Sequence, residues 1–178
     1  MVYLFGSTSK ITFPGSGVGA MGASAENIRF IKSQMTVPVI SWNKVNMLMH
    51  VRFFKDKAGI DAHMLRHAAS VRPKFEAVEE ILERELGGLG IGEWTQPKGG
   101  YFISFDSLDG CAKDIVARCK KAGVVMTPAG ATYPYGKDPK DSNIRIAPSY
   151  PSVEELGKAA EVFVLCVKLV SVEKLLEK

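Results

Sequence analysis

The chain has 178 residues, of which 46% are hydrophobic and 24% are charged, and these values are ordinary for a soluble globular protein. Its 23 Lys and Arg residues and 19 Asp and Glu residues are spread along the chain without a basic block, which argues against a nucleic-acid-binding face. No apolar run approaches the length of a membrane span and no signal peptide is recognisable, so we expect a cytoplasmic protein without a membrane segment.

The first predicted element is a short strand over residues 2–5, and its apolar composition is typical of a strand buried on both faces in a parallel sheet. Gly6 ends the strand, and residues 7–9 then place three hydroxyls beside the ammonium of Lys10. Open α/β sheets bind ligands at the carboxyl ends of their strands. A partly desolvated lysine there can condense with an aldehyde, and the hydroxyls suit a phosphate. Both groups on one small molecule describe pyridoxal phosphate; the alternative is a surface lysine in a polar loop.

A different interpretation of this stretch uses its glycines. Gly15, Gly17 and Ala20 fit the dinucleotide-binding fingerprint G-x-G-x-x-G/A, which places a pyrophosphate at a helix N-terminus. However, these glycines do not follow the first strand directly, and residues 18–23 are predicted to form a second strand rather than a helix. The expected acidic residue about twenty positions further on is also missing. We therefore set the dinucleotide interpretation aside.

Helices are predicted in the next part of the chain. Ser24 can cap a helix that runs to about Gln34. A second helical pattern begins near Ser41, and Gly59 is expected to end it. The apolar residues of this second helix recur at three-residue steps and form one stripe: Val45, Leu48, Val51 and Phe54.

The third predicted helix is long, with Asp61 as its cap and Gly87 at its end. Pro73 should kink it, because proline removes a backbone donor. His63 and His67 lie four residues apart on this helix and share a face at metal-ligand spacing. No third ligand is evident nearby, so we interpret them as exposed helix histidines and expect no metal site.

Strands and helices alternate after Gly87, which indicates an α/β or α+β layer of about three strands covered by helices. The three cysteines lie among apolar residues and are interpreted as buried free thiols. Ser152 and Glu155 form a capping-box pattern that opens a last long helix. The predicted strands are residues 99–105, 124–126 and 143–147, a helix covers residues 111–122, and the inward residues of the last helix are Leu156, Ala160, Phe163, Val167 and Val170.

Arg145 stands in the otherwise apolar strand at residues 143–147, where a solitary cation needs a partner. Its guanidinium offers a planar fork of donors that can grip a carboxylate in a bidentate manner. An ion pair with an internal Asp or Glu would satisfy the same need. The residues alone leave these two interpretations open.

Four segments of the sequence resemble class I and II aminotransferases of fold type I, which depend on pyridoxal 5'-phosphate. GSTSKITFPGSGVG, at residues 6–19, resembles their cofactor-lysine segment, and NIRIAPSYPS, at residues 143–152, resembles their C-terminal segment. PKGGYFISFD and GVVMTPAGATYP look like strands of their small domain. The likeness is greatest to a branch that includes an aspartate aminotransferase-like family and the effector domains of some bacterial transcription regulators.

The resemblance implies a role for each matching residue. Lys10 matches the lysine that forms a Schiff base with the cofactor, and Ser7 matches a serine that binds its phosphate. Arg145 matches the arginine that holds the substrate α-carboxylate. The sequence departs from the pattern at Gly17, where the family usually has an arginine that binds the phosphate. Either Ser7, Ser9 and backbone N–H groups of the turn hold the phosphate instead, or the chain binds the cofactor weakly.

In the resembled enzymes the cofactor lysine lies well past the middle of the chain. The resemblance therefore implies the C-terminal portion of a longer, homodimeric enzyme that transfers an amino group between an amino acid and a 2-oxo acid. Residues that contact the cofactor ring would lie upstream, so the chain alone is expected to be inactive. We assign residues 1–40 to a remnant of the large cofactor-binding domain, 41–86 to linking helices, and 87–178 to the small C-terminal domain.

Two other functions stay open. One is an effector-sensing domain of a bacterial transcription regulator, which would keep both the lysine and the arginine. An upstream helix-turn-helix module would favour it. The other is a degenerate structural domain, which the missing phosphate arginine at Gly17 permits.

Overall fold

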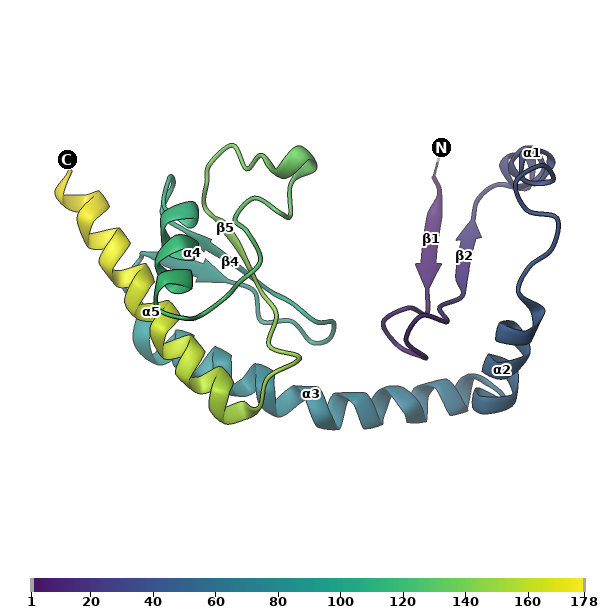
Figure 1. Cartoon of the computed structure of the whole chain (residues 1–178), viewed down its shortest axis with the longest axis horizontal. Coiled ribbons are helices and arrows are strands. Elements are labelled where there is room, and N and C mark those ends of the chain that lie inside the picture. Colours follow the sequence, from purple (N-terminus) through teal and green to yellow (C-terminus); the bar gives the residue numbers. More distant parts are fainter. Residues whose placement is uncertain (1, 178) are drawn as a thin grey trace. The chain divides into compact units, whose positions relative to one another are not determined.

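The chain divides into two compact units, Met1–His67 and Ala68–Lys178, and the computed structural model describes residues 2–177 (Figure 1). No helix within these described residues is long and apolar enough to cross a membrane. The first unit contains β1 (Leu4–Ser7), β2 (Gly19–Gly22), α1 (Ala25–Met35), α2 (Lys44–Phe54) and the beginning of α3 (Lys57–Leu86). The second contains the rest of α3, β3 (Gly92–Trp94), β4 (Ile103–Ser107), α4 (Ala112–Lys121), the 3-10 turn η1 (Pro134–Gly136), β5 (Asn143–Ile146) and α5 (Val153–Leu176).

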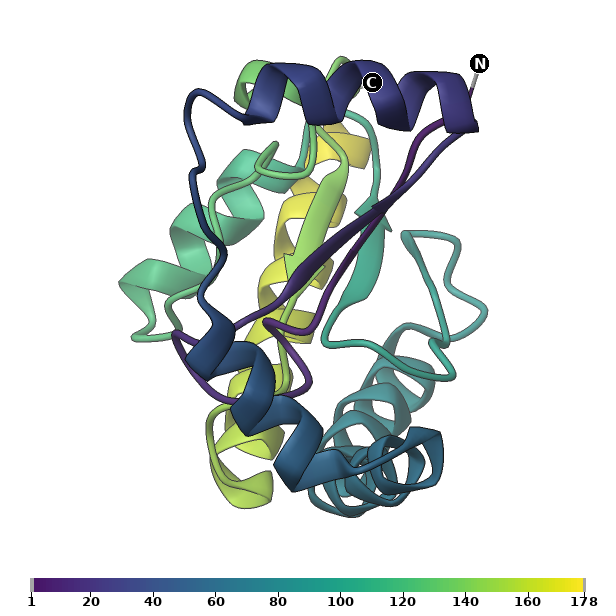
Figure 2. The same ribbon diagram turned by 90° about the vertical axis from the view of Figure 1, so that its right-hand side faces the viewer.

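In the first unit, β1 and β2 form an antiparallel pair (Figure 1; Figure 2 shows it nearly edge-on), with Leu4 opposite Gly22 and Ser7 opposite Gly19. The prediction of a doubly buried strand in a parallel sheet is therefore wrong. The intervening turn reverses the chain directly, which makes the pairing antiparallel. Leu4 and Phe5 are 68% and 78% exposed, because no layer within the described residues covers them.

The first two helices begin with side-chain caps. α1 starts as predicted, since Ser24 Oγ accepts a backbone N–H of the first turn at 3.3 Å. α2 starts later than predicted, because Asn43 rather than Ser41 caps it by accepting the N–H of Asn46 at 3.0 Å. Of the predicted apolar stripe on α2, only Phe54 is buried among the described residues. This helix therefore keeps an uncovered apolar face.

The corner between α2 and α3 differs from the prediction. Gly59 lies inside α3, where a Cβ would overlap the carbonyl oxygen of Phe54, so only glycine allows this close approach. The chain turns at Lys55, whose φ is 65°, and Asp56 Oδ1 caps α3 by accepting the N–H of Gly59 at 2.9 Å. Asp61 is not the cap; it forms an ion pair within the helix.

The second unit is a three-stranded antiparallel sheet in the order β3–β4–β5, packed against helices. α4, α5 and the last turns of α3 join the sheet in one hydrophobic core, and α3 runs through Pro73 as a single helix. The mixed α/β architecture predicted from the sequence is confirmed. Its fully buried core residues come from all of these elements and include Leu82, Leu86, Ile103, Phe105, Ile115, Ile144 and Val167.

Local signals in this unit are mostly confirmed. The N–H of Glu155 donates to Ser152 Oγ at 3.2 Å and the N–H of Ser152 donates to Glu155 Oε2 at 2.8 Å, which completes the capping box. The five residues predicted to face inward on α5 are all buried. The three cysteines are buried and free, and burial raises the pKa of Cys119 to about 12.

One predicted strand of this unit does not form. Residues 124–126 have no strand conformation. The N–H of Val124 donates instead to the carbonyl of Cys119 in α4 at 2.8 Å, so the segment is tied to the helix end and joins no sheet.

Candidate active site

Lys10 lies in the turn between β1 and β2, and its side chain is exposed. Thr8 closes the base of this turn: its N–H donates to the carbonyl of Val18 at 2.9 Å, and its Oγ1 accepts the Val18 N–H at 2.8 Å. The N–H of Thr12 donates to the carbonyl of Thr8 at 3.0 Å, which closes a tight turn around Lys10. The Thr8 hydroxyl oxygen thus accepts a hydrogen bond inside the turn.

The hydroxyls of Ser7 and Ser9 remain available. Their Oγ atoms are 2.7 Å apart, and the N–H of Ser9 donates to Ser7 Oγ at 3.1 Å. Both residues are exposed and flank Thr8 in the segment that leads to Lys10. The two hydroxyls are hydrogen-bonded to each other, and both can donate to one phosphate group when it replaces that mutual bond. The pair therefore fits the phosphate of the cofactor that the sequence suggests.

Gly17, at the position where the resembled family usually has arginine, packs directly against Ser9. A Cβ on residue 17 would overlap Ser9 Oγ and lie 3.1 Å from Ser9 Cα. The turn has no room for a side chain here, and an arginine could enter only if Ser9 moved. The hydroxyl of Ser9 occupies the space that an arginine side chain would need.

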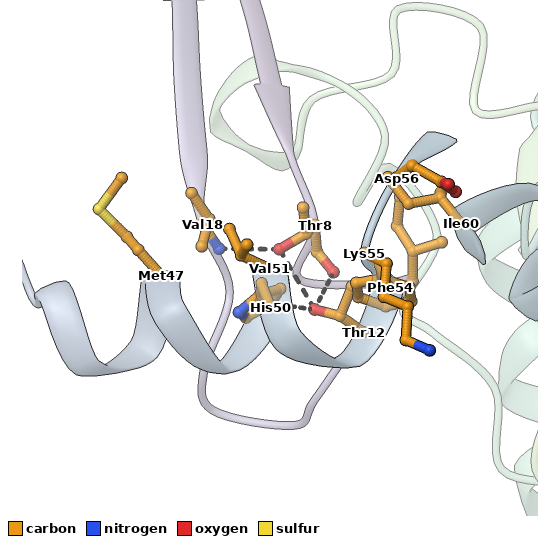
Figure 3. Close-up of a pocket in the computed structure, with 11 residues that line it drawn as sticks. Thr8, Thr12, Val18, Met47, His50, Val51, Phe54, Lys55, Asp56 and Ile60 are labelled. Atoms are coloured by element: carbon orange, nitrogen blue, oxygen red, sulfur yellow. Dashed lines mark hydrogen bonds between the residues drawn. The ribbon is translucent and has the colours of Figure 1, made fainter. Parts of the chain in front are cut away.

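Two residues of α2 that the sequence patterns did not reveal contact the turn. His50 Nε2 lies 2.9 Å from Thr12 Oγ1 (Figure 3), and His50 Nδ1 lies 2.9 Å from the carbonyl oxygen of Asn46. Asn46 also donates through Nδ2 to the carbonyl of Ser16 at 2.9 Å. His50 is 9% exposed, whereas most of α2 is uncovered. These contacts join residues 38 and 30 positions apart, so no local pattern in the sequence could signal them.

A cavity of about 340 Å³ lies next to this contact, between the turn and α2 (Figure 3). Lys10, Ser7 and Ser9 do not line it, so the cavity is separate from the two available hydroxyls. Its polar groups come mainly from the network around His50, and most other lining residues are apolar. The lining is Thr8, Ile11, Thr12, Val18, Met47, His50, Val51, Phe54, Lys55, Asp56 and Ile60.

The histidine pair on α3 also reaches the turn. His63 Nε2 lies 2.9 Å from the carbonyl oxygen of Ile11, the residue after Lys10, and His67 Nε2 lies 2.9 Å from His63 Nε2. Both histidines are half-buried, so the prediction of two exposed helix histidines is wrong. Within residues 2–177, no group of three or more His, Cys, Asp or Glu side chains is arranged to hold a metal ion.

Arg145 lies in β5 and is half-buried. Its guanidinium carbon lies 4.5 Å from the centre of the Phe102 ring, and Nη2 donates to Thr127 Oγ1 at 3.4 Å. Among the described residues, Arg145 Nε is buried without a hydrogen-bond partner, and no carboxylate lies within ion-pair distance of the guanidinium. The internal ion pair that the sequence left open is therefore not formed within residues 2–177.

A cavity of about 210 Å³ in the second unit is bordered by Arg145 and Thr127. Most of its other walls are apolar side chains from α5 and from residues 124–126. Arg145 thus gives this cavity its cationic group. Lys10 belongs to the first unit and Arg145 to the second. The position of each residue is therefore defined only within its own unit.

A hydrogen-bond network holds the start of β5, two residues before Arg145. Asn143 Nδ2 donates to Ser104 Oγ and to Asp106 Oδ1, both at 2.9 Å. The carboxylate of Asp138 accepts two backbone N–H groups at 2.8 Å, one of them from Asn143. Burial by itself would raise the pKa of Asp138, but the backbone donors lower it below its ordinary value. The network fixes the strand that carries Arg145.

The chain is similar to known proteins over nearly its whole length. The family model described as aspartate amino-transferase matches residues 1–178. A protein of Mycolicibacterium smegmatis that carries an aminotransferase name is 48% identical over 173 residues, which cover 97% of this chain and 40% of that protein. The aspartate aminotransferase of Corynebacterium glutamicum is 45% identical over 171 residues, which cover 96% of this chain and 40% of that protein. The chain therefore spans about 40% of the length of these curated relatives.

Solved structures give a similar result. The crystal structure of an aspartate transaminase from Corynebacterium glutamicum is 45% identical, with a TM-score of 0.92, and the match covers 97% of this chain and 41% of that one. A kynurenine aminotransferase from Pyrococcus horikoshii, described in complex with PMP, is 25% identical with a TM-score of 0.78. This second match covers 92% of this chain and 40% of that one.

Proposed function

Because the chain belongs to the aspartate amino-transferase family, we propose that it is the C-terminal part of a pyridoxal-phosphate-dependent aminotransferase. The whole enzyme would transfer an amino group between an amino acid and a 2-oxo acid. The observation that carries the proposal is the turn between β1 and β2, where Lys10 follows two exposed hydroxyls whose oxygens are 2.7 Å apart. An amine beside phosphate-binding hydroxyls is what this cofactor needs.

In this proposal, Lys10 Nζ holds the aldehyde carbon of pyridoxal phosphate, and Ser7 and Ser9 donate hydrogen bonds to the phosphate. When bound, the cofactor supplies a conjugated ring that accepts the electron pair left at the substrate Cα. Thr8 stabilises the turn, because its hydroxyl oxygen accepts the N–H of Val18. Gly17 allows the turn to close on Ser9.

In this proposal, Arg145 binds the substrate. Its guanidinium has no carboxylate partner among the described residues, so it can pair with the α-carboxylate of an amino acid or of a 2-oxo acid. The amine of Lys10 would be the group that moves the proton from the substrate Cα.

The proposal extends to the whole protein. The parent enzyme would be a cytoplasmic homodimer, as the family resemblance implies. The chain alone would not catalyse amino transfer, since it spans about 40% of the length of the relatives and the groups that contact the cofactor ring would lie in the remainder. An assay of the chain with a panel of amino acids and 2-oxo acids should therefore show no transfer.

Reductive labelling of this chain tests the assignment of Lys10. The chain is mixed with pyridoxal phosphate, so that a lysine amine and the aldehyde join with loss of water. Borohydride then delivers the hydride that makes the C–N bond permanent, and peptide mapping locates the label. We expect Lys10 to be labelled at lower cofactor concentration than Lys137, an exposed lysine of the second unit. Lys10→Ala should lose this preferential label, and equal labelling of the two lysines would refute the assignment.

A further inference from the structure

The turn that carries Lys10 has little regular structure of its own, and side chains of α2 and α3 contact it. Thr12, two residues after Lys10, meets His50 through the 2.9 Å contact between Oγ1 and Nε2. Asn46, one helical turn before His50, donates to the carbonyl of Ser16 further along the same turn. One face of α2 therefore holds the turn at two points.

The chemistry of His50 fixes the direction of its hydrogen bonds. Its Nδ1 faces the carbonyl oxygen of Asn46 at 2.9 Å, and a carbonyl oxygen can only accept. Nδ1 therefore carries the ring proton, and Nε2 of the neutral ring is an acceptor. The Thr12 hydroxyl can therefore donate its proton to Nε2, which at 2.9 Å is the nearest of its acceptors.

The Thr12 hydroxyl also reaches the base of the turn. It lies 3.2 Å from both the carbonyl oxygen and the hydroxyl oxygen of Thr8, which are the other two acceptors within reach of its proton. Thr8 Oγ1 in turn accepts the N–H of Val18. Thr12 Oγ1 thus links His50 to the base of the turn, where Thr8 pairs with Val18.

We propose that His50 is a positioning residue for Lys10, which acts by accepting the hydrogen bond of Thr12 and so holds the amine of Lys10 in line with the hydroxyls of Ser7 and Ser9. This inference rests on the proposed function, in which those hydroxyls hold the phosphate and Lys10 holds the aldehyde carbon. His50 touches neither group, and its effect passes through Thr12. Its burial and its edge-on contact with Phe13, at a centroid distance of 5.2 Å, keep the imidazole in place.

The sharpest test changes Thr12, because two substitutions there separate the hydroxyl from the side-chain volume. Thr12→Val keeps the shape and removes the donor, whereas Thr12→Ser keeps the donor. His50→Phe is the matched change on α2, since it keeps a ring beside Phe13 and removes the acceptor. Each variant is labelled with pyridoxal phosphate and borohydride over a range of cofactor concentrations, and the labelling rates of Lys10 and Lys137 are measured in the same molecules.

Thr12→Val and His50→Phe should lower the limiting labelling rate of Lys10 about tenfold, the size expected for the loss of one well-formed hydrogen bond. The half-saturating cofactor concentration should change less than about twofold, because the phosphate hydroxyls are untouched. Thr12→Ser should restore the rate, and the rate at Lys137 should not change.

Wild-type labelling of Lys10 in Thr12→Val would overturn the inference. So would a loss that Thr12→Ser does not restore, or a loss shared equally by Lys137, because either result would mean general disorder rather than positioning by the hydroxyl. A wild-type chain with no preferential label at Lys10 would instead overturn the proposed function on which the inference depends.

Discussion

Ser9 fills the space beside Gly17: the hydroxyl oxygen of Ser9 lies where the Cβ of any larger residue at position 17 would have to be. A side chain at position 17, where the resembled enzymes usually have arginine, would therefore require Ser9 to move. The guanidinium that usually binds the phosphate and the present position of Ser9 exclude each other.

Gly17→Ala should therefore destabilise the Lys10 turn, by about 1–3 kcal/mol in the free energy of unfolding, because the added methyl group overpacks against Ser9. Preferential labelling of Lys10 should fall with it. Gly6→Ala is the matched control, since a Cβ there meets nothing within 4 Å. Urea unfolding and reductive labelling of both variants provide the measurement, and equal effects at the two glycines would show that Ser9 does not set the constraint.

Ser7→Ala should weaken the binding of pyridoxal phosphate, by about 1.5–3 kcal/mol, because a hydrogen bond to a charged phosphate is lost. The binding of pyridoxal, which lacks the phosphate, should hardly change. The comparison separates loss of a phosphate contact from loss of the fold. The measurement is the half-saturating concentration of each aldehyde for the labelling of Lys10. An equal loss of affinity for both aldehydes would show that Ser7 does not bind the phosphate.

Arg145→Met should leave the stability of the second unit unchanged or raise it, although it removes a residue proposed for substrate binding. The reason is that Arg145 Nε is buried without a partner among the described residues, and a buried group of this kind costs about 1–3 kcal/mol. Thermal unfolding checks the direction. A large fall in stability would mean that the contacts with Phe102 and Thr127 outweigh the cost of burying the cation.

Stability should decrease in acid because of Asp138. Burial opposes its ionisation, but backbone N–H groups lower its pKa below the ordinary value. A carboxylate with a lowered folded-state pKa stabilises fully above the unfolded pKa, about 3.9, and this contribution disappears as the pH falls through the folded pKa. Urea unfolding at pH values from 7 down to 3 should show this loss, and Asp138→Ala should show a smaller one. If the wild-type chain and Asp138→Ala lost the same stability as the pH fell, the acid sensitivity would come from other groups.

The parts of the fold that the sequence predicts are those decided by near neighbours. The caps at Ser24 and Ser152 and the inward face of α5 were predictable, because each depends on residues within one or two helical turns. The start of α3 was not, since it depends on the positive φ of Lys55, a residue with no intrinsic preference for that conformation.

In the candidate site, too, the sequence predicts what near neighbours decide and misses what distant contacts decide. Lys10, Ser7 and Ser9 lie within four consecutive residues, so the sequence alone predicts that they are close together. The contact between Thr12 and His50 spans 38 positions, and the tight fit of Ser9 against Gly17 depends on how the turn closes. Neither relationship has a period or motif that could reveal it.

The two units differ in how far they bury their own apolar residues. The core described for the second unit contains sheet and helix residues that are almost inaccessible, whereas Leu4, Phe5 and Val45 of the first unit are 68%, 78% and 80% exposed. Exposed aromatic and aliphatic surface of this kind drives self-association and attracts chaperones and proteases. Expressed without the rest of the longer enzyme that we propose, the segment that carries Lys10 would be degraded before the unit that carries Arg145.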